Sequence, residues 1–182
     1  MLLMSSVFCV MADPTLNRVL DDSRYDAQER AEIRELLNDA EGSSISAELL
    51  LPRVQEAKAK RVPAQRLLVA LRQEIARLEK ARDILLSAVD AKKILLDDAG
   101  WQRTANLIAW GATDEEIRAI ALACVDNVEA YLEASYLFTS LVEWGLEREV
   151  SVELVFEVAG SEIEPDEYPG VLEVLINGRR LR

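Results

Sequence analysis

Carboxylates are the only side chains here whose types and spacing could do acid–base chemistry. Asp97 and Asp98 are adjacent, and Asp114, Glu115 and Glu116 form a second run. Two converging carboxyl groups can catalyse glycoside hydrolysis, and carboxylate oxygens can hold a metal ion. Neighbouring carboxylates on a helix, however, point in different directions, and those at a helix start are stabilised by the helix dipole. Helix capping explains both runs, so we expect no catalytic, cofactor or metal site.

The rest of the composition excludes most other reaction types. The chain has no histidine, which removes histidine-based triads, metal sites and the commonest general base. Of the two cysteines, Cys124 lies on the apolar face of IRAIALACV, where a small buried hydrophobe is the expected role. The seven glycines are isolated, so the sequence has no glycine-rich phosphate loop.

The elements that would position these residues are predicted to be helices. Between residues 46 and 89, apolar residues recur at alternating spacings of three and four, which line one face of a helix: Leu68, Leu71, Ile75, Leu78, Leu85 and Val89. Pro63 suits the first helical position, so a long helix is expected from Pro63 to Ala91. We expect it to pack within its own domain; the alternative is pairing with a partner.

Capping patterns predict further helices on both sides of the long one. Asp26 and Glu29 have capping-box spacing for a helix over residues 26–41, closed by Gly42. Ser46 is expected to cap a helix that reaches Lys60.

Beyond residue 110, Thr113 with Glu116, and Asp126 with Glu129, suggest two more helix starts. These patterns predict an all-α protein of seven or eight helices.

The second half of the chain contains a possible repeat. LIAWG ends at Gly111, LVEWG at Gly145 and VLING at Gly178, at spacings close to the length of a helical hairpin. We therefore expect helix-hairpin repeats of about 34 residues. Residues 150–158 are ambiguous, because VSVELVFEV alternates like a strand. A single strand would have no partner, so we predict a helix capped by Ser151.

Charge divides the chain into two predicted lobes. Residues 46–93 hold eleven Lys or Arg against six Asp or Glu, whereas residues 94–170 hold three against seventeen. The expected organisation is a helical lobe over residues 13–93 with the long basic helix, and an acidic helical-hairpin lobe over residues 94–182. The two halves could neutralise each other, or the basic segment could meet an anionic partner. The net charge of −12 at pH 7 argues against broad nucleic-acid binding.

The N-terminal residues resemble the end of a secretory signal. The apolar run from Leu2 to Met11 is too short to span a bilayer, and Val10, Met11 and Ala12 roughly fit a cleavage site. No Lys or Arg precedes the run, so an apolar tail is the alternative. We expect residues 1–12 to be a signal peptide, removed before Asp13, and the mature protein to be periplasmic with no stable membrane span. A cytoplasmic location is the alternative.

The segment VQEAKAKRVP, residues 54–63, resembles a motif of uncharacterised exported bacterial helical proteins, Glu-Gly-x-Ala-Lys-x-Val-Pro. Ala57 stands here where that motif has its glycine. The resemblance implies export and a helical architecture, and it implies no particular activity.

Together these observations favour a non-catalytic envelope protein that binds another protein through a helical surface. The first contact candidates are the basic cluster, defined as Lys58, Lys60 and Arg61, and the tryptophans Trp110 and Trp144. Their alternative roles are a solvated helix end and core packing. The competing functions are a carboxylate-dependent periplasmic enzyme and a cytoplasmic regulatory adaptor.

Overall fold

The computed structural model describes Arg18, Leu20 and residues 25–88, 98–124 and 127–180. Within these residues the protein is all-α, with eight α-helices, one short 3-10 helix and no strand. This confirms the predicted fold class. The chain divides into two compact units, residues 1–75 and residues 76–182, which are described separately below. The predicted lobe boundary at residue 93 lies outside the described residues.

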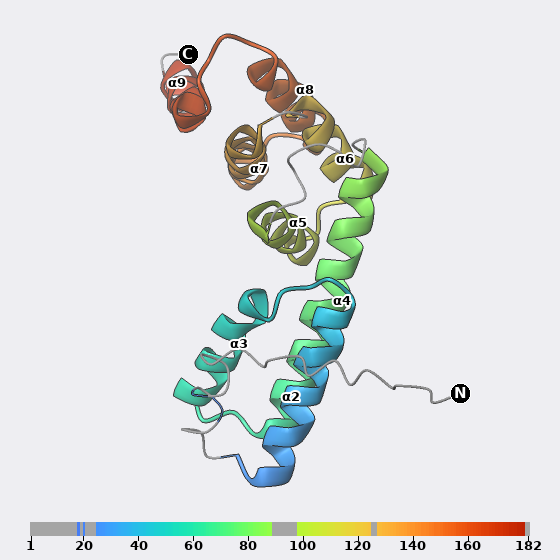
Figure 1. Ribbon diagram of the computed structural model, residues 1–182. Coiled ribbons are helices and arrows are strands. Elements are labelled where there is room, and N and C mark those ends of the chain that lie inside the picture. The colour runs from blue at the N-terminus through green and yellow to red at the C-terminus, as the bar shows by residue number, and fades with distance from the viewer. Residues whose placement is uncertain (1–17, 19, 21–24, 89–97, 125–126, 181–182) are drawn as a thin grey trace, which may run out of the picture. The chain divides into compact units, whose positions relative to one another are not determined.

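The first unit contains two complete helices and the start of a third (Figure 1). Their bounds are α2, Ala27–Gly42; α3, Ala47–Ala59; and α4, Ala64–Ala88, which continues into the second unit. The predicted caps are confirmed at two starts. Asp26 and Glu29 form a complete capping box on α2, and the Ser46 side chain accepts a hydrogen bond at the start of α3.

The core of the first unit comes from the inner faces of these three helices. Its fully buried large side chains include Ile33, Leu37, Leu50, Leu67, Leu68 and Leu71. Tyr25 donates a hydrogen bond from its hydroxyl to the Val62 carbonyl oxygen at 3.0 Å, which ties the start of α2 to the α3–α4 turn. Arg53 on α3 pairs with the buried Glu74 on α4 at 3.4 Å. Side-chain contacts therefore hold α3 against the first half of α4.

The long helix α4 has the apolar face that its sequence predicts. Leu68, Leu71, Leu78 and Leu85 are buried, and Ile75 is half-buried. The buried face is broader than the predicted line, because Leu67, Ala81 and Ile84 are also buried. The described helix ends at Ala88, and residues 89–97 lie outside the described part of the chain.

The second unit contains the rest of α4 and the remaining helices (Figure 1). They are α5, Asp98–Trp110; α6, Asp114–Ala123; α7, Val128–Glu143; α8, Arg148–Ala159; the 3-10 helix η1, Pro165–Glu167; and α9, Tyr168–Arg180. Residues 150–158 are helical, as predicted, although α8 begins earlier than expected. Ser151 is buried inside α8 rather than capping it, and donates to the Glu147 carbonyl oxygen at 2.9 Å.

Helix α7 is the centre of the second unit. It packs against α5, α6, α8 and α9, and α6 also packs against α8. Its buried residues include Tyr131, Phe138 and Leu141, all of which are inaccessible to solvent. The Thr104 hydroxyl on α5 lies 2.6 Å from the Tyr131 hydroxyl and donates to the Gly100 carbonyl oxygen, so these buried hydroxyls are hydrogen-bonded.

The helix ends correct several sequence predictions. Gly111 and Gly145 have positive φ, and each closes a helix as expected. Gly42 does not play this role, because it is the last residue of α2, and Ser44 takes the positive φ. Asn127, not Asp126, caps α7. Helix α9 continues through Gly178, so the third predicted helix end is wrong and the structure does not show the 34-residue repeat.

No helix among the described residues is both long and apolar enough to cross a membrane.

Candidate functional site

The candidate site lies on the pair formed by α6 and α8. Thr113 caps α6 in a complete capping box with Glu116, and the first turn also carries Asp114 and Glu115. Helix α8 begins at Arg148. The first turns of the two helices line one groove, and their last turns line a second cavity. The two helices therefore run side by side in the same direction.

An arginine–glutamate pair locks the two helix starts together. Arg148 donates from Nε and Nη2 to the two carboxylate oxygens of Glu116, both at 2.6 Å. The same Nη2 donates to the Gly111 carbonyl oxygen at 3.1 Å, at the end of α5. The Arg148 guanidinium also lies 5.0 Å from the Trp110 ring centroid. One side chain of α8 thus connects α8 to the α5–α6 junction.

Electrostatics keep both partners of this pair charged. Hydrogen bonds from Arg148 lower the pKa of Glu116, although partial burial opposes the change. The hydrogen bonds to Glu116 in turn raise the pKa of Arg148. A general acid at neutral pH needs a raised carboxyl pKa, which is the opposite direction. Glu116 is therefore placed to hold structure rather than to supply a proton.

The groove between the helix starts has a volume of about 530 Å³ and an acidic lining. Its charged lining, as far as the structure describes the chain, is four glutamates and one arginine: Glu115, Glu116, Glu149, Glu153 and Arg148. Glu116 neutralises Arg148, and Glu115 lies within ion-pair distance of Arg118, so Glu149 and Glu153 contribute most to the negative charge of the groove. Ala119 and Val152 supply its apolar part. The Glu115 carboxylate is 3.7 Å from Arg118, and its side chain is 83% exposed.

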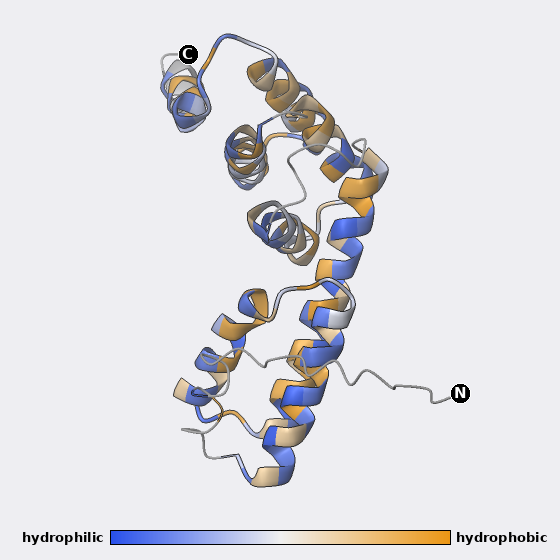
Figure 2. Ribbon diagram, in the orientation of Figure 1, coloured by the Kyte–Doolittle hydropathy of each residue, from blue (hydrophilic) through white to orange (hydrophobic). Residues whose placement is uncertain are grey.

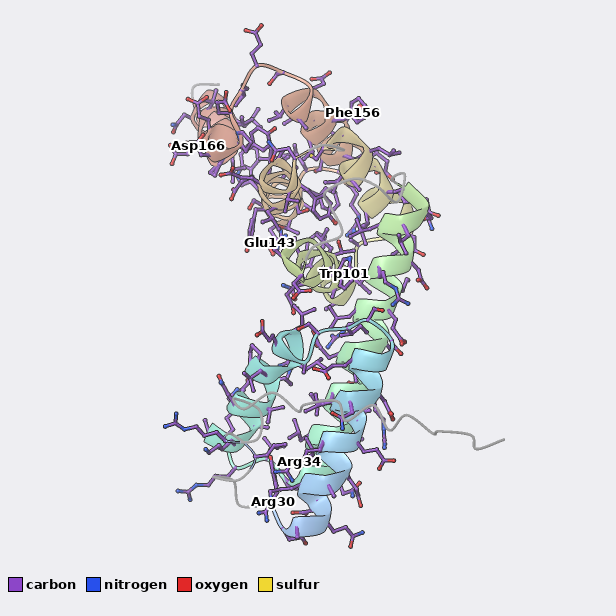
Figure 3. All side chains as sticks on the ribbon, in the orientation of Figure 1. Arg30, Arg34, Trp101, Glu143, Phe156 and Asp166 are labelled. Atoms are coloured by element: carbon purple, nitrogen blue, oxygen red, sulfur yellow. The ribbon has the colours of Figure 1, made fainter. Side chains whose placement is uncertain are left out.

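Large apolar side chains continue from this groove along both helices. Leu122 on α6 is 52% exposed, and Phe156 on α8 is 56% exposed and lies on the outer side of α8 (Figure 3). Helical spacing places Leu122 on the same face as Ala119, and Phe156 on the same face as Val152. These two residues therefore extend the groove into an apolar strip. We call the groove together with Leu122 and Phe156 the α6–α8 strip.

The strand-like alternation of residues 150–158 places apolar residues on more than one side of α8. In a helix, residues that alternate in sequence fall on different faces, and hydrophobic colour appears on the visible side of α8 (Figure 2). Val155 and Val158 face the core and are buried, whereas Val150 and Phe156 are exposed. Helix α8 therefore exposes Val150 and Phe156 outside its core face.

A second cavity of about 410 Å³ lies at the other end of the helix pair. Leu122, Cys124, Ala159, Glu162 and Glu164 are among its lining residues. Burial raises the pKa of the Cys124 thiol to about 11, so the thiol stays protonated at neutral pH. Its burial agrees with the predicted role of a small core residue.

The carboxylates that could have formed an active site are at helix starts. Asp98 is in the first turn of α5, and Asp114 in the first turn of α6 pairs with Lys80 at 2.8 Å. Asp97 lies outside the described residues. Among the residues that the structure describes, no group of three or more carboxylates and cysteines could hold a metal ion. An ion pair with Lys80 holds Asp114, and the capping box and Arg148 hold Glu116, so these two carboxylates have structural roles.

The basic cluster lies at the C-terminal end of α3, in the first unit. Lys58 is in the last turn, Lys60 is the C-cap, and Arg61 follows with a φ of 57°. Lys60 pairs with Glu56 at 2.6 Å. Lysine side chains at this end of a helix are favoured by the dipole, which is a structural role that needs no partner. Binding by this cluster stays a prediction.

The two predicted tryptophan anchors are both half-buried in the second unit. Trp110 packs edge-on against Phe138 at 5.8 Å, and its indole nitrogen donates to Glu143 at 3.2 Å. Trp144 is the C-cap of α7. The contacts of Trp110 favour a packing role for that residue.

The α6–α8 strip was not among the sequence predictions. Leu122 and Phe156 belong to helices with apolar core faces. The neighbouring residues in the sequence do not show which apolar side chains stay exposed. The available signal was the alternation in residues 150–158, where a helix would have more apolar positions than one core face can bury.

Comparison with protein-family models, curated proteins and solved structures finds no match to this chain. The resemblance of residues 54–63 to exported helical proteins therefore stays a prediction.

Proposed function

We propose that this chain is a non-catalytic interaction protein that binds another protein through the α6–α8 strip. The observation that supports the proposal is the exposure of Leu122 and Phe156 next to an open groove. Exposed apolar side chains beside a concave surface are typical of protein-binding sites, because their burial on binding is favourable. Burying one large apolar side chain contributes about 1.5–3 kcal/mol.

The proposal places this interaction in the bacterial envelope. The apolar run at residues 2–11 and the small-residue pattern before Asp13 support export. The basic cluster and Trp144 remain further contact candidates.

Site-specific photocrosslinking in the native host tests this function. A photoreactive phenylalanine analogue replaces Phe156 in one variant and Tyr136 in a control variant. Tyr136 is also an exposed aromatic, at 54%, but it lies on α7 and the Arg103 guanidinium stacks on its ring at 3.7 Å. We expect a discrete protein adduct from position 156 that is absent from position 136.

Identification of the adduct by mass spectrometry then names the partner. Absence of any adduct at position 156, or the same adducts at both positions, would contradict binding through the strip. The basic cluster is tested in the same host by reversing the charges of Lys58, Lys60 and Arg61 and comparing the yield of the adduct. An unchanged yield means that this cluster is only a solvated helix end.

A further inference from the structure

We infer that the partner segment is a cationic amphipathic helix that lies along the α6–α8 strip. This inference rests on the proposed function and specifies the chemistry of the partner. It is carried by the charge that accompanies the exposed apolar residues, and by the parallel arrangement of the two helices.

The charge along the strip has one sign. Four glutamates line the groove at the helix starts, and Glu162 and Glu164 line the cavity at the helix ends. Among the described residues that line the groove or the cavity, Arg148 is the one cation, and its bidentate pair with Glu116 neutralises it. A partner that buries Leu122 and Phe156 must therefore bring its polar side chains close to these carboxylates, of which Glu149 and Glu153 are exposed. Lysine and arginine side chains are attracted to this acidic surface, whereas acidic side chains would be repelled.

The shape of the strip fits a helix. Two parallel helices form a groove between them, and each contributes two apolar residues on one face: Ala119 and Leu122 are three positions apart, and Val152 and Phe156 are four apart. From Glu149 to Phe156 the strip advances seven residues, which is about 10 Å of helix axis. The groove and the cavity extend it at both ends, so a partner helix of about three turns would cover it. An amphipathic helix in a groove presents its apolar positions at this same spacing.

The binding test uses the full chain and a designed peptide of about 18 residues, a length chosen for measurable helicity. The peptide has leucine at alternating spacings of three and four, and lysine elsewhere. A second peptide keeps the leucines and replaces each lysine with glutamate. Both are labelled with fluorescein, and binding is measured by fluorescence polarisation at about 0.15 M and about 0.5 M salt, because screening weakens exposed ionic contacts.

Two pairs of substitutions separate the apolar and charged contributions. Leu122→Ser with Phe156→Ser removes the apolar contacts, and Glu149→Gln with Glu153→Gln removes two groove charges. The matched controls are on α9 in the same unit: Val174→Ser, at a side chain 72% exposed, and Glu173→Gln, at an exposed carboxylate. Circular dichroism checks that each variant keeps its helical content.

We expect the wild type to bind the lysine peptide and not the glutamate peptide. The serine pair should weaken binding by about tenfold or more, as for central apolar contacts of an interface. The glutamine pair should weaken it by about threefold to tenfold and reduce its salt dependence. Both α9 controls should bind like the wild type.

Three outcomes would overturn the inference. Equal binding by the serine pair and the wild type would mean general attraction to an acidic surface. If the lysine peptide does not bind but position 156 still gives its adduct in the host, the partner is not a cationic helix. The proposed function then stands, with a partner of different chemistry. A dimer in light scattering that dissociates in the Phe156→Ser variant would make a second copy of the chain the occupant.

Discussion

At the scale of single residues, the Arg148–Glu116 pair is the most constrained interaction of the candidate site. Each carboxylate oxygen of Glu116 accepts a hydrogen bond from Arg148 at 2.6 Å, and one of them also accepts from the Thr113 backbone at 2.7 Å. The Glu116 side chain is 13% exposed and that of Arg148 is 36% exposed. A bidentate, partly buried pair of this kind contributes more than an ordinary surface ion pair.

Glu116→Gln tests this contribution. Glutamine can still complete the capping box, so the substitution removes mainly the charge. We expect a loss of about 1–2 kcal/mol in the free energy of unfolding at pH 7, measured by urea titration. Because the folded-state pKa of Glu116 is lowered, its contribution is complete above the ordinary pKa of 4.5 and disappears as the pH falls through the folded value.

The difference between wild type and Glu116→Gln should therefore shrink at about pH 3. Glu149→Gln, at an exposed neighbouring carboxylate, is the control and should change stability by less than about 0.5 kcal/mol. The same loss at both pH values would mean that shape, and not charge, explains the effect.

Cys124 gives a second prediction at this scale. In a Cys9→Ser background it is the remaining thiol, and burial raises its pKa from 9.0 to about 11. At pH 8 this shift alone reduces the thiolate fraction by about a hundredfold. We expect Ellman's reagent to react with the native protein at least about a hundredfold more slowly than with the protein in denaturant. Rapid reaction of the native thiol would show that Cys124 is accessible, against the buried position described above.

At the scale of elements, four helices end with the same backbone conformation. After each of these helices, a backbone N–H donates a hydrogen bond to the carbonyl oxygen five positions earlier. The four donors are Ile45, Val62, Ala112 and Leu146. In each case the preceding residue has positive φ: Ser44, Arg61, Gly111 and Gly145. Glycine adopts this conformation without strain, whereas a residue with a Cβ atom does not. The first unit therefore carries strain at two helix ends that the second unit avoids.

Alanine substitutions should distinguish glycines that have positive φ from a glycine that is helical. Gly111→Ala and Gly145→Ala place a Cβ at φ values of 100° and 96°, and each should cost about 1–2 kcal/mol, which lowers Tm by about 2–8 °C. Gly42→Ala is the control, because Gly42 is helical and an added Cβ would meet nothing within 4 Å. That change should leave Tm unchanged or raise it. Equal effects at Gly42 and Gly111 would contradict this account.

Arg61→Gly is the reverse test. Removing the Cβ at a φ of 57° relieves strain of about 1 kcal/mol, partly offset by the greater freedom of glycine in the unfolded chain. We expect Tm to stay equal or rise. The matched change Lys60→Gly, at a residue with an α-helical φ of −83°, should lower it. A fall of Tm in both variants would show that Arg61 contributes through its side chain.

At the scale of the whole molecule, the predicted export changes which residues the mature protein contains. If residues 1–12 are a signal peptide, the mature chain begins at Asp13 and loses Cys9. Intact-mass measurement of the protein from fractionated native cells should then show a periplasmic species that starts at Asp13. A species that retains Met1 in the cytoplasmic fraction would contradict export and favour the regulatory-adaptor alternative.

The sequence by itself determined the helical class and the starts of α2, α3, α4 and α6, because both depend on interactions a few residues apart. The spacing of Leu68, Leu71 and Leu78 and the capping boxes at Asp26 and Thr113 are local patterns, and the structure contains all of them. The prediction of a helix at residues 150–158 rests on the apparent repeat and on the lack of a partner for a single strand.

The tertiary structure decided which side chains meet and which apolar residues stay exposed. Arg148 and Glu116 are 32 positions apart, and no periodicity links them. Val155 and Phe156 are adjacent and equally apolar, yet one is buried against the core and the other is 56% exposed. Burial depends on which neighbouring helix covers each face, and that is a property of the packed chain.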